Sequence, residues 1–180
     1  MADLDFIRDA ILRKTLEDSI EYIYALFEQS KVDRQKKLYQ EETYRVIILY
    51  VVSAIEAVLL YFYKVRGEKI EYVEYKFVQT LPLQYRHSGK IGLPVVVAVQ
   101  EKMEKQEHQL GIHELVAFFR GKKLMQEKTA GDILDMNDVR NTFHFNKSRT
   151  QVCDLKRVEK ALQLLVHTIE NAPKSLETKG

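Results

Sequence analysis

Apolar residues recur at three- and four-residue steps along most of the chain, the spacing that places them on one face of an α-helix. The pattern predicts core helices over residues 5–30, 38–66, 94–109, 132–144 and 151–171, with a shorter helical segment over 112–119. Gly67 and Pro173 stand just beyond two of the predicted ends, as residues that stop helices commonly do. We therefore expect an all-α fold, a bundle of four or five helices.

Residues 68–93 break this pattern. Residues 69–78 are aromatic and β-branched with partial alternation, which predicts a short strand or hairpin arm. The prolines and glycines between residues 82 and 94 indicate an irregular crossover, and Pro94 suits the first position of the next helix. The chain is thus expected to form a single helical domain, residues 1–180, with a small β or loop insertion around residues 68–93.

Residues 46–63 form the most apolar run, with 16 apolar residues among 18. That length reaches the lower limit for a membrane-spanning helix. Glu56 lies near its middle, where a carboxylate in lipid costs about 2.5–3.5 kcal/mol. A helix that is apolar on all sides is equally expected at the centre of a soluble bundle. We favour the buried helix and expect no membrane association.

The overall charge limits the kinds of partner. Lysine and arginine total 28 against 26 acidic residues, a net charge of +2, which excludes a strongly basic clamp around nucleic acid. Any anion site must be a local patch. The chain has one cysteine, which excludes a disulfide framework and a four-cysteine zinc site and fits a reducing compartment. We expect a cytoplasmic protein.

The stretch from residue 138 to 149 carries the most informative chemistry. Arg140 and His144 are four positions apart, so on a helix they share one face. Lys147 and Arg149 follow without an acidic residue between 140 and 150, and residues 156 and 157 add two cations beside two acids. A guanidinium binds phosphate oxygens at two points, and an imidazole exchanges protons near neutral pH. The pattern therefore favours chemistry on a phosphodiester.

An Arg-Asn pair followed shortly by His, late in a small helical bundle, resembles the HEPN family (higher eukaryotes and prokaryotes nucleotide-binding). The resemblance implies a four- or five-helix fold, usually dimeric, in which two motifs meet at the dimer cleft. Many members are metal-independent endoribonucleases of toxin–antitoxin, abortive-infection or CRISPR-linked defence systems. It implies that Arg140 binds phosphate, that Asn141 is the motif's polar residue and that His144 is catalytic.

The resemblance further implies RNA as substrate, a homodimer, an antitoxin or defence partner, and no metal or other cofactor. Lys147 and Arg149 are expected to bind flanking phosphates. Glu56, a carboxylate within an apolar helix, must be paired, hydrogen-bonded or protonated. We predict that it faces the helix of Arg140 and His144 and orients one of them. The alternative is that it points to solvent or pairs elsewhere.

Two other readings of the motif stay open. Three residues separate Arg140 from His144, whereas the family usually has four to six, and this shorter spacer favours a catalytically inactive RNA- or nucleotide-binding or dimerisation module. The near-neutral net charge favours a helical scaffold without a nucleic-acid role. In that case Arg140 pairs with surface acids and His144 is a core residue.

Two further residue types could carry chemistry in other sequence contexts. His108 and His113 lie beside glutamates, but Gly111 stands between them, and we interpret them as a solvated helix end. Cys153 has no neighbouring histidine or acid in an arrangement that indicates a nucleophile. We expect a buried or half-buried thiol.

Overall fold

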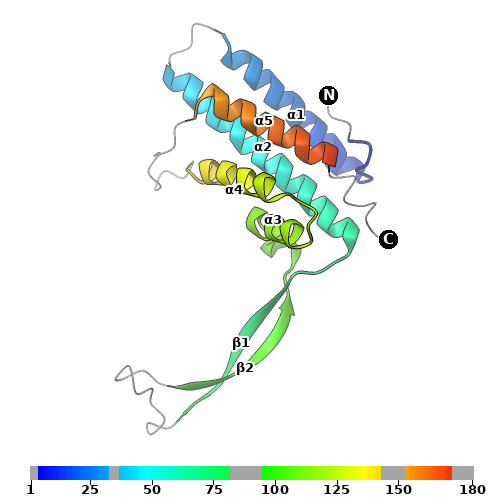
Figure 1. Cartoon of the computed structure of the whole chain (residues 1–180), viewed down its shortest axis with the longest axis vertical. Coiled ribbons are helices and arrows are strands. Elements are labelled where there is room, and N and C mark those ends of the chain that lie inside the picture. The colour runs from blue at the N-terminus through cyan, green and yellow to red at the C-terminus, as the bar shows by residue number, and fades with distance from the viewer. Residues whose placement is uncertain (1–3, 33–36, 82–94, 143–152, 172–180) are drawn as a thin grey trace. The chain divides into compact units, whose positions relative to one another are not determined.

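The structure is a computed structural model that describes residues 4–32, 37–81, 95–142 and 153–171 (Figure 1). The chain divides into two compact units. The helical unit comprises Met1–Glu68 and Leu110–Gly180, and the β unit comprises Lys69–Gln109. The predicted small insertion is therefore a unit of its own, and it extends beyond residue 93. The expectation of a mostly helical chain with a small β element is confirmed.

Five helices form the described part of the helical unit: α1 (Ala10–Ser30), α2 (Lys37–Arg66), α3 (Ile112–Gly121), α4 (Glu127–Asn141) and α5 (Leu155–Asn171). α2 packs against each of the other four helices. α1 and α4 run in one direction, and α2 and α5 run in the opposite one (Figure 1). α1 and α2 are thus antiparallel neighbours.

The ends of the first two helices follow from local capping. α1 begins at Ala10 rather than near residue 5 because the Asp9 carboxylate accepts hydrogen bonds from the backbone N–H groups of Ile11 and Leu12, each at 3.0 Å. α2 has nearly its predicted bounds. Gly67 follows it with a φ of +64°, and its N–H donates to the Lys64 carbonyl at 3.0 Å. Glycine adopts this left-handed conformation without a steric penalty.

α2 is the centre of the hydrophobic core, which explains its nearly uniform apolar sequence. Several of its side chains are at most 1% exposed: Ile47, Ile48, Val51, Val52, Ile55, Val58 and Phe62. The other helices contribute equally buried side chains, among them Ile23, Leu115, Ile133, Met136 and Val158. By length and hydropathy residues Tyr39–Arg66 would also suit a membrane span, and 56% of their most apolar window is buried. Hydropathy by itself does not distinguish these two roles.

α4 and α5 differ from prediction at their ends. α4 begins at Glu127, before the predicted residue 132, and ends at Asn141 with Thr142 as its C-cap. The Thr142 hydroxyl donates to the Val139 carbonyl at 2.7 Å. α5 begins at Leu155 rather than near residue 151, and the Asp154 carboxylate accepts from the Arg157 N–H at 2.8 Å. Acidic side chains at this position satisfy free N–H groups and favour a helix start.

The β unit contains two antiparallel strands, β1 (Glu71–Thr80) and β2 (Val96–Glu104). The helix predicted over residues 94–109 is wrong: this segment forms β2 and then a 3₁₀ turn at Glu107–Gln109. β-branched valines occupy four of the five positions from Val95 to Val99, and such residues favour strands. The segment forms a strand because it pairs with β1. The apolar spacing within one segment does not reveal such a distant pairing. The arm predicted around residues 69–78 is confirmed as β1.

Candidate functional site

Arg140 and Glu56 form an ion pair between α4 and α2. Arg140 lies in the last turn of α4, and its Nη1 donates to Glu56 Oε2 at 2.7 Å. The side chains are 30% and 25% exposed, respectively. The predicted contact between Glu56 and the helix of Arg140 is therefore present. Whether Glu56 orients Arg140 for function stays a prediction.

The pair holds Arg140 at one end of its guanidinium group. A guanidinium carries five N–H donors, so the bond to Glu56 leaves others for a second oxygen ligand. Partial exposure keeps the group within reach of solvent and of a solute. A partly exposed ion pair contributes only about 0.2–1 kcal/mol to stability. The chemical consequence of this pair is thus the placement of a cation rather than fold stability.

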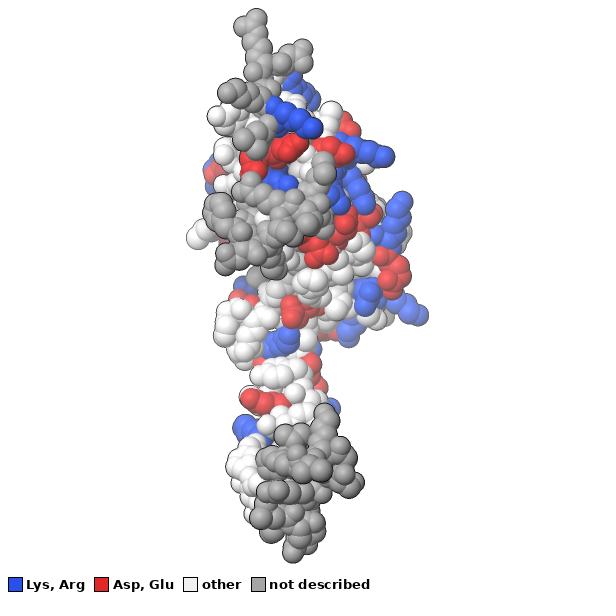
Figure 2. Space-filling model, turned by 90° about the vertical axis from the view of Figure 1, so that its left-hand side faces the viewer, with Lys and Arg blue, Asp and Glu red and all other residues white. Residues whose placement is uncertain are grey.

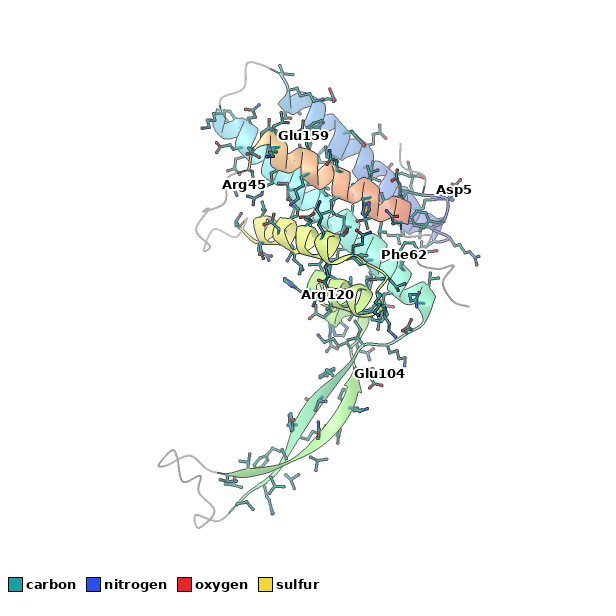
Figure 3. All side chains as sticks on the ribbon, viewed as in Figure 1. Asp5, Arg45, Phe62, Glu104, Arg120 and Glu159 are labelled. Atoms are coloured by element: carbon teal, nitrogen blue, oxygen red, sulfur yellow. The ribbon has the colours of Figure 1, made fainter. Side chains whose placement is uncertain are left out.

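Arg45 is a second arginine at the same end of α4, which sequence reasoning missed. It is 6% exposed, and its Nη1 donates to Thr142 Oγ1 at 3.0 Å across 97 residues of sequence. Figure 3 shows Arg45 on α2 beside the end of α4. The available signal was a cation at an apolar-periodic position of α2, between Tyr44 and Ile47. Arg45 is buried and joins two helices, a structural role.

Cys153 lies near Arg45 and is 1% exposed. Burial raises the pKa of the Cys153 thiol, and the positive charges of Arg45 and Arg157 oppose this rise only in part. The thiol is thus held in its neutral, weakly nucleophilic form near pH 7. The interpretation of Cys153 as a buried thiol is confirmed.

The remaining predicted site residues divide between described and undescribed parts of the chain. Asn141 is half-buried and is the last residue of α4, directly after Arg140. His144, Lys147 and Arg149 lie outside the described residues. The predicted relation of one helical turn between Arg140 and His144 therefore stays a prediction.

A histidine and an asparagine form another polar contact near Arg140 that sequence reasoning missed. Asn137 is 4% exposed and lies one turn before Asn141 on α4. Its Nδ2 is 3.2 Å from Nε2 of His113, an exposed residue of α3. The predicted solvated position of His113 is thus confirmed, while its link to α4 was not foreseen. Residues 137, 140 and 141 share one face of α4 through their three- and four-residue spacing.

The cations at the start of α5 are compensated by acids of α4. Arg157 lies 3.7 Å from Asp135, and Lys160 lies 2.6 Å from Asp132. An open depression of about 510 Å³ lies here, lined by residues of both charge signs. The positive patch expected to extend through residues 156 and 157 is therefore balanced in this part of the described surface.

No family model, curated protein or solved structure matches the chain. Among the described residues, no group of three or more histidine, cysteine, aspartate or glutamate side chains is arranged to hold a metal ion. The described site is thus Arg140, partly exposed at the end of α4 and bound by Glu56. Two further polar contacts, Arg45–Thr142 and His113–Asn137, join this end of α4 to α2 and α3.

Proposed function

We propose that the chain is a cytoplasmic, HEPN-like ribonuclease that cleaves RNA without a metal ion. The observation that carries the proposal is the Arg140 guanidinium, which Glu56 holds at 2.7 Å while its side chain keeps 30% exposure. Asn141 follows it, and His144 completes the Arg-Asn-x-x-His motif in sequence. A held but accessible cation suits an anionic phosphate oxygen.

The proposed reaction is an internal transfer within RNA. The ribose 2′-oxygen attacks the adjacent phosphorus, the bond from phosphorus to the 5′-oxygen of the next nucleotide breaks, and that oxygen takes a proton. The products are a 2′,3′-cyclic phosphate and a 5′-hydroxyl. His144 takes the proton from the 2′-hydroxyl and delivers one to the departing 5′-oxygen, and Arg140 stabilises the negative charge of the phosphorane.

The other motif residues have supporting roles in this proposal. Asn141 holds the substrate or the histidine tautomer, and Lys147 and Arg149 bind the flanking phosphates. Glu56 is a positioning residue, because it acts through Arg140. As the family resemblance implies, the active form is a homodimer, and an antitoxin or defence partner controls it.

A catalytically inactive, RNA-binding module is the second candidate. It is favoured by the three-residue spacer between Arg140 and His144, which is shorter than the family usually has. The cations of the described site are compensated, Arg140 by Glu56, Arg157 by Asp135 and Lys160 by Asp132. In this case RNA affinity depends mainly on Lys147 and Arg149. Binding without turnover distinguishes this candidate from the nuclease.

The test compares the wild-type protein with His144→Ala on a mixed RNA pool in the presence of EDTA. We expect wild-type cleavage to persist and to leave 2′,3′-cyclic phosphate ends, because no metal takes part. Cleavage should fall at least about 100-fold in His144→Ala, the usual contribution of a general acid or base. End-group analysis of the RNA identifies the products.

His167→Ala is the matched control. His167 is an exposed histidine of α5, and its ring contacts Asn171 of the same helix at 3.1 Å. Its replacement should leave cleavage unchanged. Equal cleavage by wild-type protein and His144→Ala, or cleavage that EDTA abolishes, would contradict the proposed mechanism. RNA binding without cleavage would support the second candidate, the catalytically inactive RNA-binding module.

A further inference from the structure

The two strands of the β unit expose most of their apolar side chains. Tyr75 is 69% and Phe77 63% exposed. Other apolar residues of the strands are between 37% and 53% exposed: Val73, Val78, Val96, Val97 and Val99. A two-stranded sheet is at best marginally stable in water unless a hydrophobic face is covered. The exposed side chains therefore indicate a surface that another molecule covers.

The strand register separates two faces of this sheet. Alternate residues of a strand point to the same face, so Val73, Tyr75 and Phe77 share one face of β1. Their partners across the strands are Lys102, Gln100 and Ala98, respectively. We call these six residues the aromatic face. The opposite face carries Val99 and the pair of Lys76 and Glu101, whose charged atoms are 2.5 Å apart. The largest exposed side chains thus lie on one side.

The outer edge of β1 is less suited to contact than this face. The register of the strand pair shifts between Phe77 and Gln79, so Val78 is an irregular position in β1. Irregularities of this kind bend a strand and interrupt its row of free hydrogen-bonding groups, and so they hinder the addition of another strand. Contact through the aromatic face is therefore more favourable than the addition of a strand beside β1.

The charges of the β unit point to the nature of its partner. Residues 69–109 carry five lysines, one arginine and five glutamates, a net charge of only +1, which is small for a surface that binds the phosphate backbone of a nucleic acid. Figure 2 shows blue and red atoms interspersed among white ones on the visible side of these residues. Next to the aromatic face, Oε2 of Glu71 lies 3.8 Å from Nζ of Lys102. A surface that carries both signs beside an apolar strip can be complementary to a copy of itself.

The area is sufficient for a specific contact between two copies. Since a buried aromatic side chain covers about 150–250 Å², Tyr75 and Phe77 each leave on the order of 100 Å² exposed. Two aromatic faces in contact, with their flanking strand residues, would remove on the order of 1,000 Å² from water, the lower bound for a specific interface. Most soluble oligomers are symmetric assemblies of one chain.

We infer that the aromatic face is a self-association surface, which packs against the same face of a second copy of the chain. Val73, Tyr75 and Phe77 of both copies become buried, and the four strands form two facing layers. This arrangement supplies the apolar cover that a two-stranded sheet lacks. The inference does not depend on the proposed ribonuclease activity.

The first test is the oligomeric state, measured by sedimentation equilibrium at micromolar concentrations. We expect the wild-type protein to be a dimer. The dissociation constant of the double variant Tyr75→Lys/Phe77→Lys should be at least about 100-fold higher, since lysines would face one another across the contact. Val99→Lys is the matched control, with the same new side chain on the opposite face, and it should remain dimeric. Circular dichroism should show an unchanged helical content in all three proteins.

The second test needs no disruption of the surface. In a Cys153→Ala background, Gln100→Cys places a thiol on the aromatic face, and Glu101→Cys places one on the opposite face. A short bis-maleimide should link Gln100→Cys into covalent dimers and leave Glu101→Cys largely unlinked. A monomeric wild-type protein, an undiminished dimer in the double lysine variant, or equal crosslinking at both positions would overturn the inference. Binding of single-stranded RNA by a monomer, lost in the double variant, would assign the face to nucleic acid instead.

Discussion

The helical unit and the β unit use similar apolar residues with opposite results. Val51 and Val52 of α2 are fully buried, whereas Val96 and Val99 of β2 are about half exposed. α2 packs against four other helices, so most of its apolar side chains find cover. Two strands form a single layer, which covers neither of its own faces. Composition therefore does not determine burial, and the number of packed layers does.

Polar contacts also differ between the two units in how deeply they are buried. In the helical unit several of them join separate helices, as Arg45 joins Thr142 and Arg140 joins Glu56. In the β unit ion pairs such as Lys76–Glu101 join neighbouring strands at exposed positions. Exposed pairs contribute little to stability, while buried polar groups are costly to lose. Mutations should therefore have unequal effects in the two units.

The largest contrast should come from apolar truncations, one in each unit. Phe62 is 1% exposed and stacks on Phe6 with ring centroids 5.4 Å apart. Phe62→Ala should lower the free energy of unfolding by about 3–5 kcal/mol. Val99→Ala in β2 should lower it by about 0.5 kcal/mol or less. Urea denaturation followed by circular dichroism measures both values, and similar losses would contradict the contrast between the units.

The next contrast lies between the two arginines of the helical unit. Arg45→Ala should cost about 2–3 kcal/mol, because it empties a buried volume and removes the bond to Thr142. Arg140→Ala should cost about 1 kcal/mol or less, because its pair with Glu56 is partly exposed. Denaturation curves for both variants test this order. If Arg140→Ala is the more damaging variant, Arg45 does not have the proposed structural role.

Glu56→Gln should have a small effect on stability and a larger one on activity. The amide keeps a hydrogen-bond acceptor for Arg140 but removes the charge, so the unfolding free energy should change by less than about 1 kcal/mol. If Glu56 positions Arg140 in the proposed nuclease, kcat should fall about tenfold. Glu159→Gln, at an exposed residue of α5, is the control. A folded Glu56→Gln protein with full activity would remove the positioning role.

The smallest effect should be the pH dependence contributed by Cys153. Because burial raises the pKa of this thiol in the folded state, its contribution to stability is fully present below the unfolded pKa of about 8.5. It should be lost as the pH rises through the higher folded pKa. Denaturation midpoints between pH 7 and alkaline pH, compared with Cys153→Ala, measure this loss. If the stability of Cys153→Ala falls with pH as steeply as that of the wild-type protein, groups other than Cys153 cause the loss.

Local sequence patterns were sufficient for much of the helical unit. The apolar positions of α2 and α5 repeat with the helical period, and Gly67 ends α2 by a conformation that few other residues adopt. These features depend on neighbours within a few residues. The same holds for Asp9, although its capping role was not recognised and α1 was expected to begin too early.

The sequence by itself thus determined the helical class of the larger unit, the apolar centre in α2 and the order of residues in the motif. Tertiary structure decided that residues 96–104 form a strand, because their valines pair with a segment more than 15 residues earlier. It also decided that Glu56 meets Arg140 and that Arg45 meets Thr142, contacts that span 84 and 97 residues. Helical periodicity is a local property, whereas burial and polar pairing depend on which distant segment supplies the partner.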